Sequence, residues 1–91
     1  PDTICDGLRA SIGKLNYEII LEGAEDVIRV SDAEVIRAMK LIWESMKIVI
    51  EPSCAVPFAA LLKERARFAG QRLGLILTGG NVDLTALDYF R

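Results

Sequence analysis

The sequence predicts an α/β fold in which helices flank a parallel sheet. From Asp26 onward, short runs rich in β-branched residues alternate with amphipathic stretches, a pattern typical of βαβ units. The runs are apolar throughout, as strands buried on both faces of a parallel sheet are. The hydrophobic fraction of 52% exceeds the roughly 45–50% of a typical soluble domain. We therefore expect other polypeptide to cover part of this apolar surface.

The first quarter of the chain has the weakest pattern. We expect residues 3–12 to form a loop with a helical turn around Gly7, and residues 14–22 to form a helix. The first strand is predicted at residues 26–30, where β-branched residues cluster.

A helix is predicted to begin at Asp32. Ser31 and Glu34 form a capping-box pattern, which marks a helix N-terminus. Apolar residues then recur every three or four positions, as on one face of a helix: Val35, Ile36, Met39, Ile42, Trp43 and Met46. A second strand is predicted at residues 48–50, and Glu51-Pro52 ends it.

A second helix is predicted from about Ala55 to Phe68. Pro57 has no amide hydrogen and is tolerated in the first turn of a helix, so the helix should not begin much before Ala55. Gly70 is predicted to end it, because glycine readily adopts the left-handed conformation at helix C-termini.

The third predicted strand, residues 73–77, runs directly into Thr78-Gly79-Gly80-Asn81. The carboxyl ends of parallel strands are where open α/β sheets bind ligands. A short terminal helix is expected over residues 82–90, with Asp83 near its positively polarised N-terminus.

Charge and cysteine content exclude several classes of function. The net charge is −2, with acids and bases spread along the chain, so there is no electrostatic footprint for nucleic acid or for an anionic membrane. No apolar run approaches the ~18 residues of a membrane span. Cys5 and Cys54 have no metal-ligand spacing and histidine is absent, so we expect no metal site and two buried free thiols in a reducing cytoplasm. The chain starts at Pro1 without signal-peptide features, and we expect it to be part of a longer protein.

Three segments together resemble the serine racemase and threonine dehydratase family of pyridoxal-phosphate-dependent enzymes. They are Thr-Ile-Cys-Asp-Gly-Leu at 3–8, Glu-Pro-Ser at 51–53 and Thr-Gly-Gly-Asn-Val-Asp at 78–83. The resemblance extends over essentially the whole chain and implies the type II, tryptophan-synthase-β-like fold. It places residues 1–91 at the C-terminal end of the large catalytic domain of a cytoplasmic homo-oligomer. Because little chain follows the third segment, we expect the short form without a regulatory domain.

The resemblance implies a cofactor site for pyridoxal 5'-phosphate. Thr78 matches the position whose hydroxyl hydrogen-bonds the pyridine nitrogen, Gly79 lies beside it, and Glu51 matches a glutamate beneath or beside the ring. A neutral hydroxyl leaves the ring nitrogen largely neutral, which suits β-elimination and racemisation better than transamination. The residues alone also permit a simpler interpretation, in which the glycines only make a turn and Glu51 caps the next helix.

Lys47 and Asn81 match positions that contact a nucleotide effector in serine racemases. Alternatively, Lys47 is a solvated lysine at a helix end and Asn81 stabilises its turn. The lysine that binds pyridoxal covalently has no counterpart in the chain, since none of its four lysines has the expected sequence context: Lys14, Lys40, Lys47 and Lys63. We therefore assign no catalytic residue and expect the 91-residue chain alone to be inactive.

The resemblance implies a dehydratase (ammonia-lyase) or racemase acting on a β-hydroxy amino acid, with serine, threonine or hydroxyaspartate as candidate substrates. Its partner would be the remainder of the catalytic domain. The alternatives are a small non-catalytic α/β ligand-binding module or an isolated structural fragment.

Overall fold

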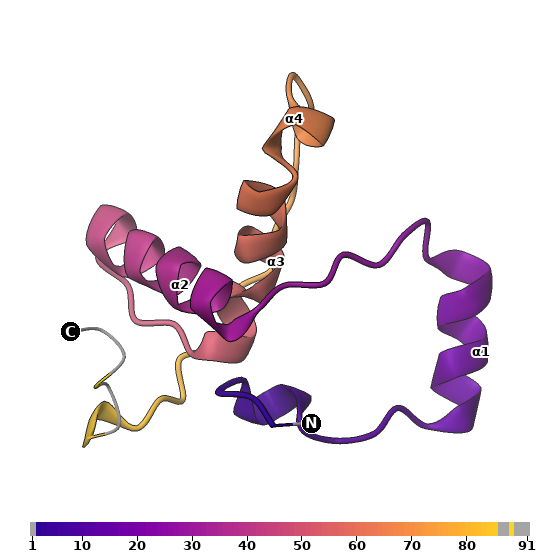
Figure 1. Cartoon of the computed structure of the whole chain (residues 1–91), viewed down its shortest axis with the longest axis horizontal. Helices are drawn as coiled ribbons and strands as arrows, with labels where there is room; N and C mark the ends of the chain where they lie inside the picture. Colours follow the sequence, from indigo (N-terminus) through magenta and orange to yellow (C-terminus); the bar gives the residue numbers. More distant parts are fainter. Residues whose placement is uncertain (1, 86–87, 89–91) are drawn as a thin grey trace.

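A computed structural model describes residues 2–85 and 88, and over these residues it is helical, with no strand. A 3-10 turn η1 (Asp6–Leu8) is followed by α1 (Lys14–Gly23), α2 (Asp32–Met46), α3 (Pro52–Lys63) and the short α4 (Arg65–Phe68) (Figure 1). The predicted turn around Gly7 and the predicted helix after Gly13 are thus both confirmed. No helix in this described part is long and apolar enough to cross a membrane.

Helix α2 begins where the capping box predicts. The Ser31 hydroxyl accepts from the Glu34 amide at 3.2 Å, and the Glu34 carboxylate accepts from the Ser31 amide at 2.7 Å. The helix ends at Lys47, which has a left-handed φ of 59° and donates its amide hydrogen to the Trp43 carbonyl. The buried face comprises Val35, Ala38, Met39 and Ile42. All but Ala38 belong to the predicted apolar series, whereas Met46 of that series is exposed.

Helix α3 begins at Pro52, so the prediction that it starts near Ala55 is wrong. Pro52 takes the first helical position, where the missing amide hydrogen is not needed. Pro57 lies inside the helix at the cost of one backbone hydrogen bond, and burial of the opposite face against α2 offsets that loss. The single helix predicted up to Phe68 is also broken, at Glu64, and α4 forms its last part. Gly70 follows the end of α4, and its φ of 76° fits the predicted role of ending the helix.

The core lies where α2 packs against α3. Small side chains on both helices allow the two backbones to approach closely, among them Ala38, Ala55 and Ala59, each at most 2% exposed. Cys5 joins this core from the N-terminal loop, and Ile50 joins it from the segment between the two helices. Trp43 connects α2 to that segment through a 3.0 Å hydrogen bond from its indole nitrogen to the Ile50 carbonyl.

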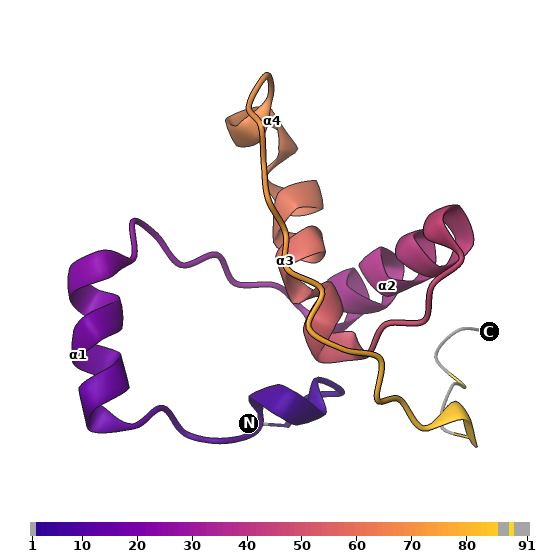
Figure 2. The ribbon, with the colours of Figure 1, turned by 180° about the vertical axis from the view of Figure 1, so that it is seen from behind.

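The three predicted strands are extended segments without the hydrogen bonds of a sheet. Residues 26–30, 48–50 and 73–77 have no regular secondary structure, although residues 73–77 run alongside α3 (Figure 2). One backbone hydrogen bond joins two of these segments, just beyond their ends, from the Glu51 amide to the Gly79 carbonyl at 3.1 Å. A strand exists only when it is paired, and the described residues supply no continuous partner. The predicted parallel sheet is therefore absent from this part of the chain.

Helix α1 stands apart from the α2–α3 pair (Figures 1 and 2). It contacts no other helix of the described part and buries none of its residues. Several of its apolar side chains are exposed: Leu15, Tyr17, Ile19, Ile20 and Leu21. Such a surface is normally covered by other polypeptide in a folded protein.

The predicted terminal helix over residues 82–90 lies partly outside the described residues. Val82 and Asp83 are not helical, whereas Leu84 and Thr85 belong to a 3-10 turn. The Asp83 carboxylate accepts hydrogen bonds from the Thr85 amide at 2.9 Å and the Thr85 hydroxyl at 2.7 Å. These bonds stabilise the charged carboxylate and hold the pKa of Asp83 below its ordinary value.

Candidate functional site

Three segments that are far apart in the sequence meet at the N-terminal end of α3. The Gly7 amide donates to the Ser53 hydroxyl at 3.1 Å, and the Glu51 amide donates to the Gly79 carbonyl at 3.1 Å. A hollow of about 500 Å³ is lined by residues of all three segments: Ile4, Asp6, Arg9, Pro52, Asn81, Val82 and Asp83. The segments that carry the resemblance therefore form one continuous surface.

The two glycines after Thr78 allow two backbone segments to approach each other. A Cβ atom at Gly79 would lie 2.7 Å from the Glu51 Oε1 atom, and one at Gly80 would lie 2.5 Å from the Val49 carbonyl oxygen. Neither glycine has a positive φ, so a left-handed turn does not explain them. Glycine is required at position 80, because a side chain there would collide with the Val49 backbone, whereas a side chain at position 79 would displace the flexible Glu51 side chain.

Glu51 is half-buried and its carboxylate lies beside Gly79. It occupies the N-cap position of α3, but its side chain makes no capping hydrogen bond. The interpretation of Glu51 as a side-chain cap is therefore wrong. Its backbone carbonyl caps the helix instead by accepting from the Cys54 amide at 3.0 Å, which leaves the carboxylate beside the Thr78–Gly80 segment.

Thr78 is exposed, and its hydroxyl makes no hydrogen bond to any residue that the structure describes. It follows residues 73–77 directly and precedes the glycine that adjoins Glu51. The Thr78 hydroxyl is thus free to donate or accept a hydrogen bond at the protein surface.

The two predicted effector residues differ in position. Asn81 lines the polar hollow, and its side chain makes no hydrogen bond within residues 2–85, so it does not stabilise its turn in the way considered above. Lys47 is exposed at the C-terminal end of α2 and does not line that hollow. For Lys47 the arrangement matches the simpler interpretation of a solvated lysine at a helix end.

Sequence reasoning missed the residues that anchor the N-terminal loop. Asp32 accepts hydrogen bonds from the Thr3 hydroxyl and, at 3.1 Å, from the Ile4 amide. Ser53 accepts the Gly7 amide, and the Arg9 guanidinium donates twice to the Thr3 carbonyl. These partners are up to 46 residues apart, and no local pattern indicates them.

Both cysteines are buried free thiols, as predicted. Burial raises the pKa of the Cys5 thiol. The hydrogen bond with Thr3 acts in the opposite direction, and the nearby Asp32 charge adds to the rise. Cys5 is therefore a packing residue and not a reactive nucleophile.

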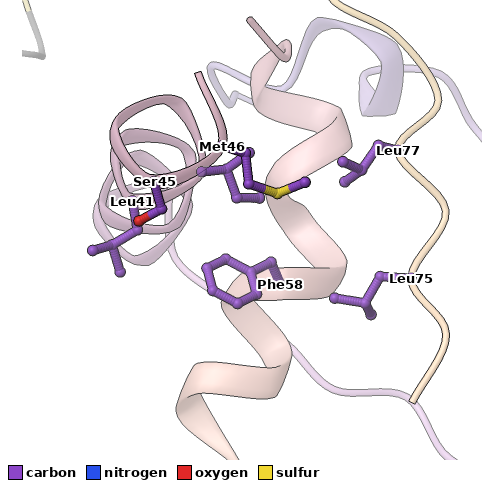
Figure 3. Close-up of a pocket in the computed structure, with 7 residues that line it drawn as sticks. Leu41, Ser45, Met46, Phe58, Leu75 and Leu77 are labelled. Carbon is purple, nitrogen blue, oxygen red and sulfur yellow. The ribbon is translucent and has the colours of Figure 1, made fainter. Parts of the chain in front are cut away.

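A second hollow, of about 370 Å³, lies between α2, α3 and residues 73–77 (Figure 3). It is lined by apolar side chains and one hydroxyl, from Leu41, Ile42, Met46, Phe58, Leu75, Leu77 and Ser45. Leu75 and Leu77 point from residues 73–77 toward the two helices (Figure 3). The lining offers no charged group to a phosphate or a carboxylate. This hollow is an uncovered part of the hydrophobic core, and the polar hollow is the better candidate site.

Comparison with known proteins identifies the relatives of this chain. Residues 1–79 match the family model described as "Pyridoxal-phosphate dependent enzyme". The chain is 46% identical over 89 residues to β-hydroxyaspartate dehydratase of Paracoccus denitrificans, which covers 98% of this chain and 28% of that protein. The crystal structure of serine racemase from Dictyostelium discoideum matches at 46% identity with a TM-score of 0.84, covering 92% of this chain and 28% of that one. Threonine deaminase from T.th. matches at 38% identity with a TM-score of 0.84, covering 91% and 30%. The chain thus spans less than a third of the length of these relatives.

Proposed function

Because the chain belongs to the family of pyridoxal-phosphate-dependent enzymes, we propose that it is the C-terminal segment of the catalytic domain of a lyase or racemase acting on a β-hydroxy amino acid. The observation that carries the proposal is the convergence of three separate segments around Thr78, Glu51 and the polar hollow. The relatives support the substrate class, since they include a β-hydroxyaspartate dehydratase, a serine racemase and a threonine deaminase.

The residues present fit one part of pyridoxal phosphate. Thr78 offers an exposed hydroxyl without a partner in the described chain, which suits a hydrogen bond to the pyridine nitrogen. The absence of a side chain at Gly79, the residue after Thr78, leaves room for the Glu51 carboxylate. Binding of the aldehyde carbon needs a free lysine amine. Lys63 is not free, because it donates to the Arg29 carbonyl at 2.6 Å and lies 3.8 Å from the Glu34 carboxylate.

Each residue then has a defined role at the ring. Bound pyridoxal phosphate supplies electron withdrawal from the bonds at the substrate α-carbon. Thr78 holds the ring nitrogen by a hydrogen bond without adding charge, so the nitrogen stays largely neutral, which favours β-elimination and racemisation over transamination. Glu51 holds a carboxylate next to Gly79, close to the place proposed for the ring. Asn81 and Lys47 remain candidate contacts for a nucleotide effector.

The remainder of the catalytic domain is the proposed partner of the uncovered apolar surfaces. We propose that residues 26–30, 48–50 and 73–77 become strands of a parallel sheet when that remainder pairs with them. The TM-score of 0.84 over 92% of the chain supports this, because most of the backbone follows a path found in the crystal structure of a serine racemase. The exposed apolar residues of α1 and the apolar hollow of Figure 3 supply surface for the same partner and for a homo-oligomer.

The proposal is tested by replacing Thr78 in the complete protein that carries this sequence. Thr78→Ala leaves the ring nitrogen without its partner, at a cost of about 1–3 kcal/mol, so turnover should fall ~10- to 100-fold and cofactor should be lost more readily. Thr78→Ser keeps the hydroxyl and should behave like the parent. Thr78→Asp should keep the cofactor but slow elimination relative to transamination. Ammonia release from hydroxyaspartate, serine and threonine measures turnover, and equal activity of the alanine and serine variants would refute the assignment.

A further inference from the structure

Residues 10–31 form an arm that leaves the α2–α3 core and returns to it, with α1 at its far side (Figure 1). Asp32, the first residue of α2, lies where the arm returns. Its Oδ1 atom accepts from the Thr3 hydroxyl, and its Oδ2 atom accepts from the Ile4 amide at 3.1 Å. The partners are 29 and 28 residues apart, so these two bonds join the two ends of the arm.

The bonds to Asp32 continue into the polar hollow through Thr3. The Thr3 hydroxyl accepts from the Cys5 amide at 3.2 Å, and the Thr3 carbonyl accepts two hydrogen bonds from the Arg9 guanidinium, at 3.0 and 2.8 Å. Arg9 also lies 3.4 Å from the Asp6 carboxylate. Asp6 and Arg9 both line the hollow, so the position of this part of its lining depends on Thr3.

We propose that Asp32 is a positioning residue, whose carboxylate fixes residues 3–9 against α2 and thereby sets the places of Asp6 and Arg9 in the polar hollow. Both oxygens of the carboxylate are used, and each accepts from a donor on the loop. The negative charge is also favourable in the first turn of a helix. An asparagine would have one acceptor oxygen for two donors. The relevance of the hollow to a cofactor or substrate rests on the proposed function, whereas the positioning of the loop does not.

The two cysteines provide a local reporter and an internal control. Cys5 lies on the loop and is 3% exposed, and Cys54 lies on α3 and is 1% exposed. Release of the loop would expose Cys5 alone, whereas general unfolding would expose both thiols. The experiment is alkylation of the complete protein with iodoacetamide, with the rate at each cysteine resolved by peptide mass spectrometry.

Asp32→Asn and Thr3→Val should each accelerate labelling of Cys5 by roughly 10-fold, because each removes a hydrogen bond to a charged carboxylate and raises the open population of the loop. Labelling of Cys54 should not change. Thr3→Ser retains the hydroxyl and should label at the parental rate. Glu34→Gln removes a charge from the same first turn of α2 without touching the loop, and it should also leave Cys5 protected.

The two variants affect the acidity of the Cys5 thiol in opposite directions. The charge of Asp32 raises the pKa of the Cys5 thiol, so its removal alone would speed labelling. The hydrogen bond with Thr3 lowers that pKa, so its removal alone would slow labelling. Faster labelling in both variants therefore requires opening of the loop. Continued protection of Cys5 in both variants, or equal acceleration at Cys5 and Cys54, would overturn the proposal. Because alkylation needs neither cofactor nor substrate, failure of the proposed function would appear in the Thr78 variants and leave the labelling result intact.

Discussion

Replacing Gly80 by alanine tests whether residues 49–51 and 78–80 lie as close together as the structure places them. The new Cβ atom would lie 2.5 Å from the Val49 carbonyl oxygen, about 0.9 Å closer than the 3.4 Å at which ordinary contact begins. A backbone carbonyl cannot rotate away as a side chain can, so the two segments must separate. Separation strains the 3.1 Å bond from the Glu51 amide to the Gly79 carbonyl.

We expect Gly80→Ala to lower the free energy of unfolding by about 1.5–4 kcal/mol, which combines overpacking with one weakened hydrogen bond. Gly79→Ala should cost less than about 1 kcal/mol, because its Cβ meets the end of the flexible Glu51 side chain, at 2.7 Å, which can move aside. Gly74→Ala is the matched control, since nothing lies within 4 Å of its Cβ and its effect should be neutral or stabilising by up to about 1 kcal/mol.

Urea denaturation of the complete protein measures all three variants under one set of conditions. The expected order of stability is Gly74→Ala, then Gly79→Ala, then Gly80→Ala. Gly79→Ala should additionally reduce activity, because it displaces the Glu51 carboxylate. If Gly80→Ala unfolds at the same urea concentration as Gly74→Ala, the two segments are not in contact and the site is wrongly assembled.

Three further predictions concern two single contacts and the exposed apolar surface. Trp43→Phe removes the 3.0 Å bond to the Ile50 carbonyl and should cost about 0.5–1.5 kcal/mol in the same denaturation assay, while an unchanged midpoint would contradict the bond. The hydrogen bond from Arg67 lowers the pKa of Asp26, so the Asp26–Arg67 pair stabilises the fold above the unfolded-state pKa of about 3.9. This stabilisation disappears as the pH falls through the folded-state pKa of Asp26. The stability difference between the parent and Asp26→Asn should therefore vanish in acid, and a difference independent of pH would refute this role of the pair. The isolated 91-residue chain should be poorly soluble or oligomeric, because its exposed apolar residues have no cover, and a monodisperse monomer in sedimentation with a sharp thermal transition would argue against the need for a partner.

Local features of the fold could be predicted from the sequence, because their causes are local. The bounds of α2 follow from the Ser31–Glu34 capping box and from apolar residues at helical spacing, and both are present in the structure. The start of α3 differs from the prediction, because Pro52 and not Pro57 is the proline that occupies the first helical position. Local propensities do not show that packing of α3 against α2 compensates for the backbone hydrogen bond lost at Pro57.

Features that depend on distant partners could not be predicted in the same way. Residues 48–50 and 73–77 have strand-like composition, but pairing decides whether a strand forms, and the described residues provide a single backbone bond beyond the ends of these segments. Asp32 was predicted as a helix start, and its bonds to Thr3 and Ile4 had no sequence signal. The resemblance singles out three segments, and the structure brings them together at the N-terminal end of α3, whereas the roles of their residues stay predictions.

We propose that this chain supplies the ring-nitrogen partner of pyridoxal phosphate, while the lysine that binds the cofactor lies elsewhere in the same protein. Reduction of the complete protein with borohydride fixes pyridoxal to that lysine, and peptide mass spectrometry then locates it. We predict one pyridoxyl-lysine, situated outside the 91 residues of this sequence. A pyridoxyl group on Lys14, Lys40, Lys47 or Lys63, or no pyridoxyl-lysine at all, would contradict the account.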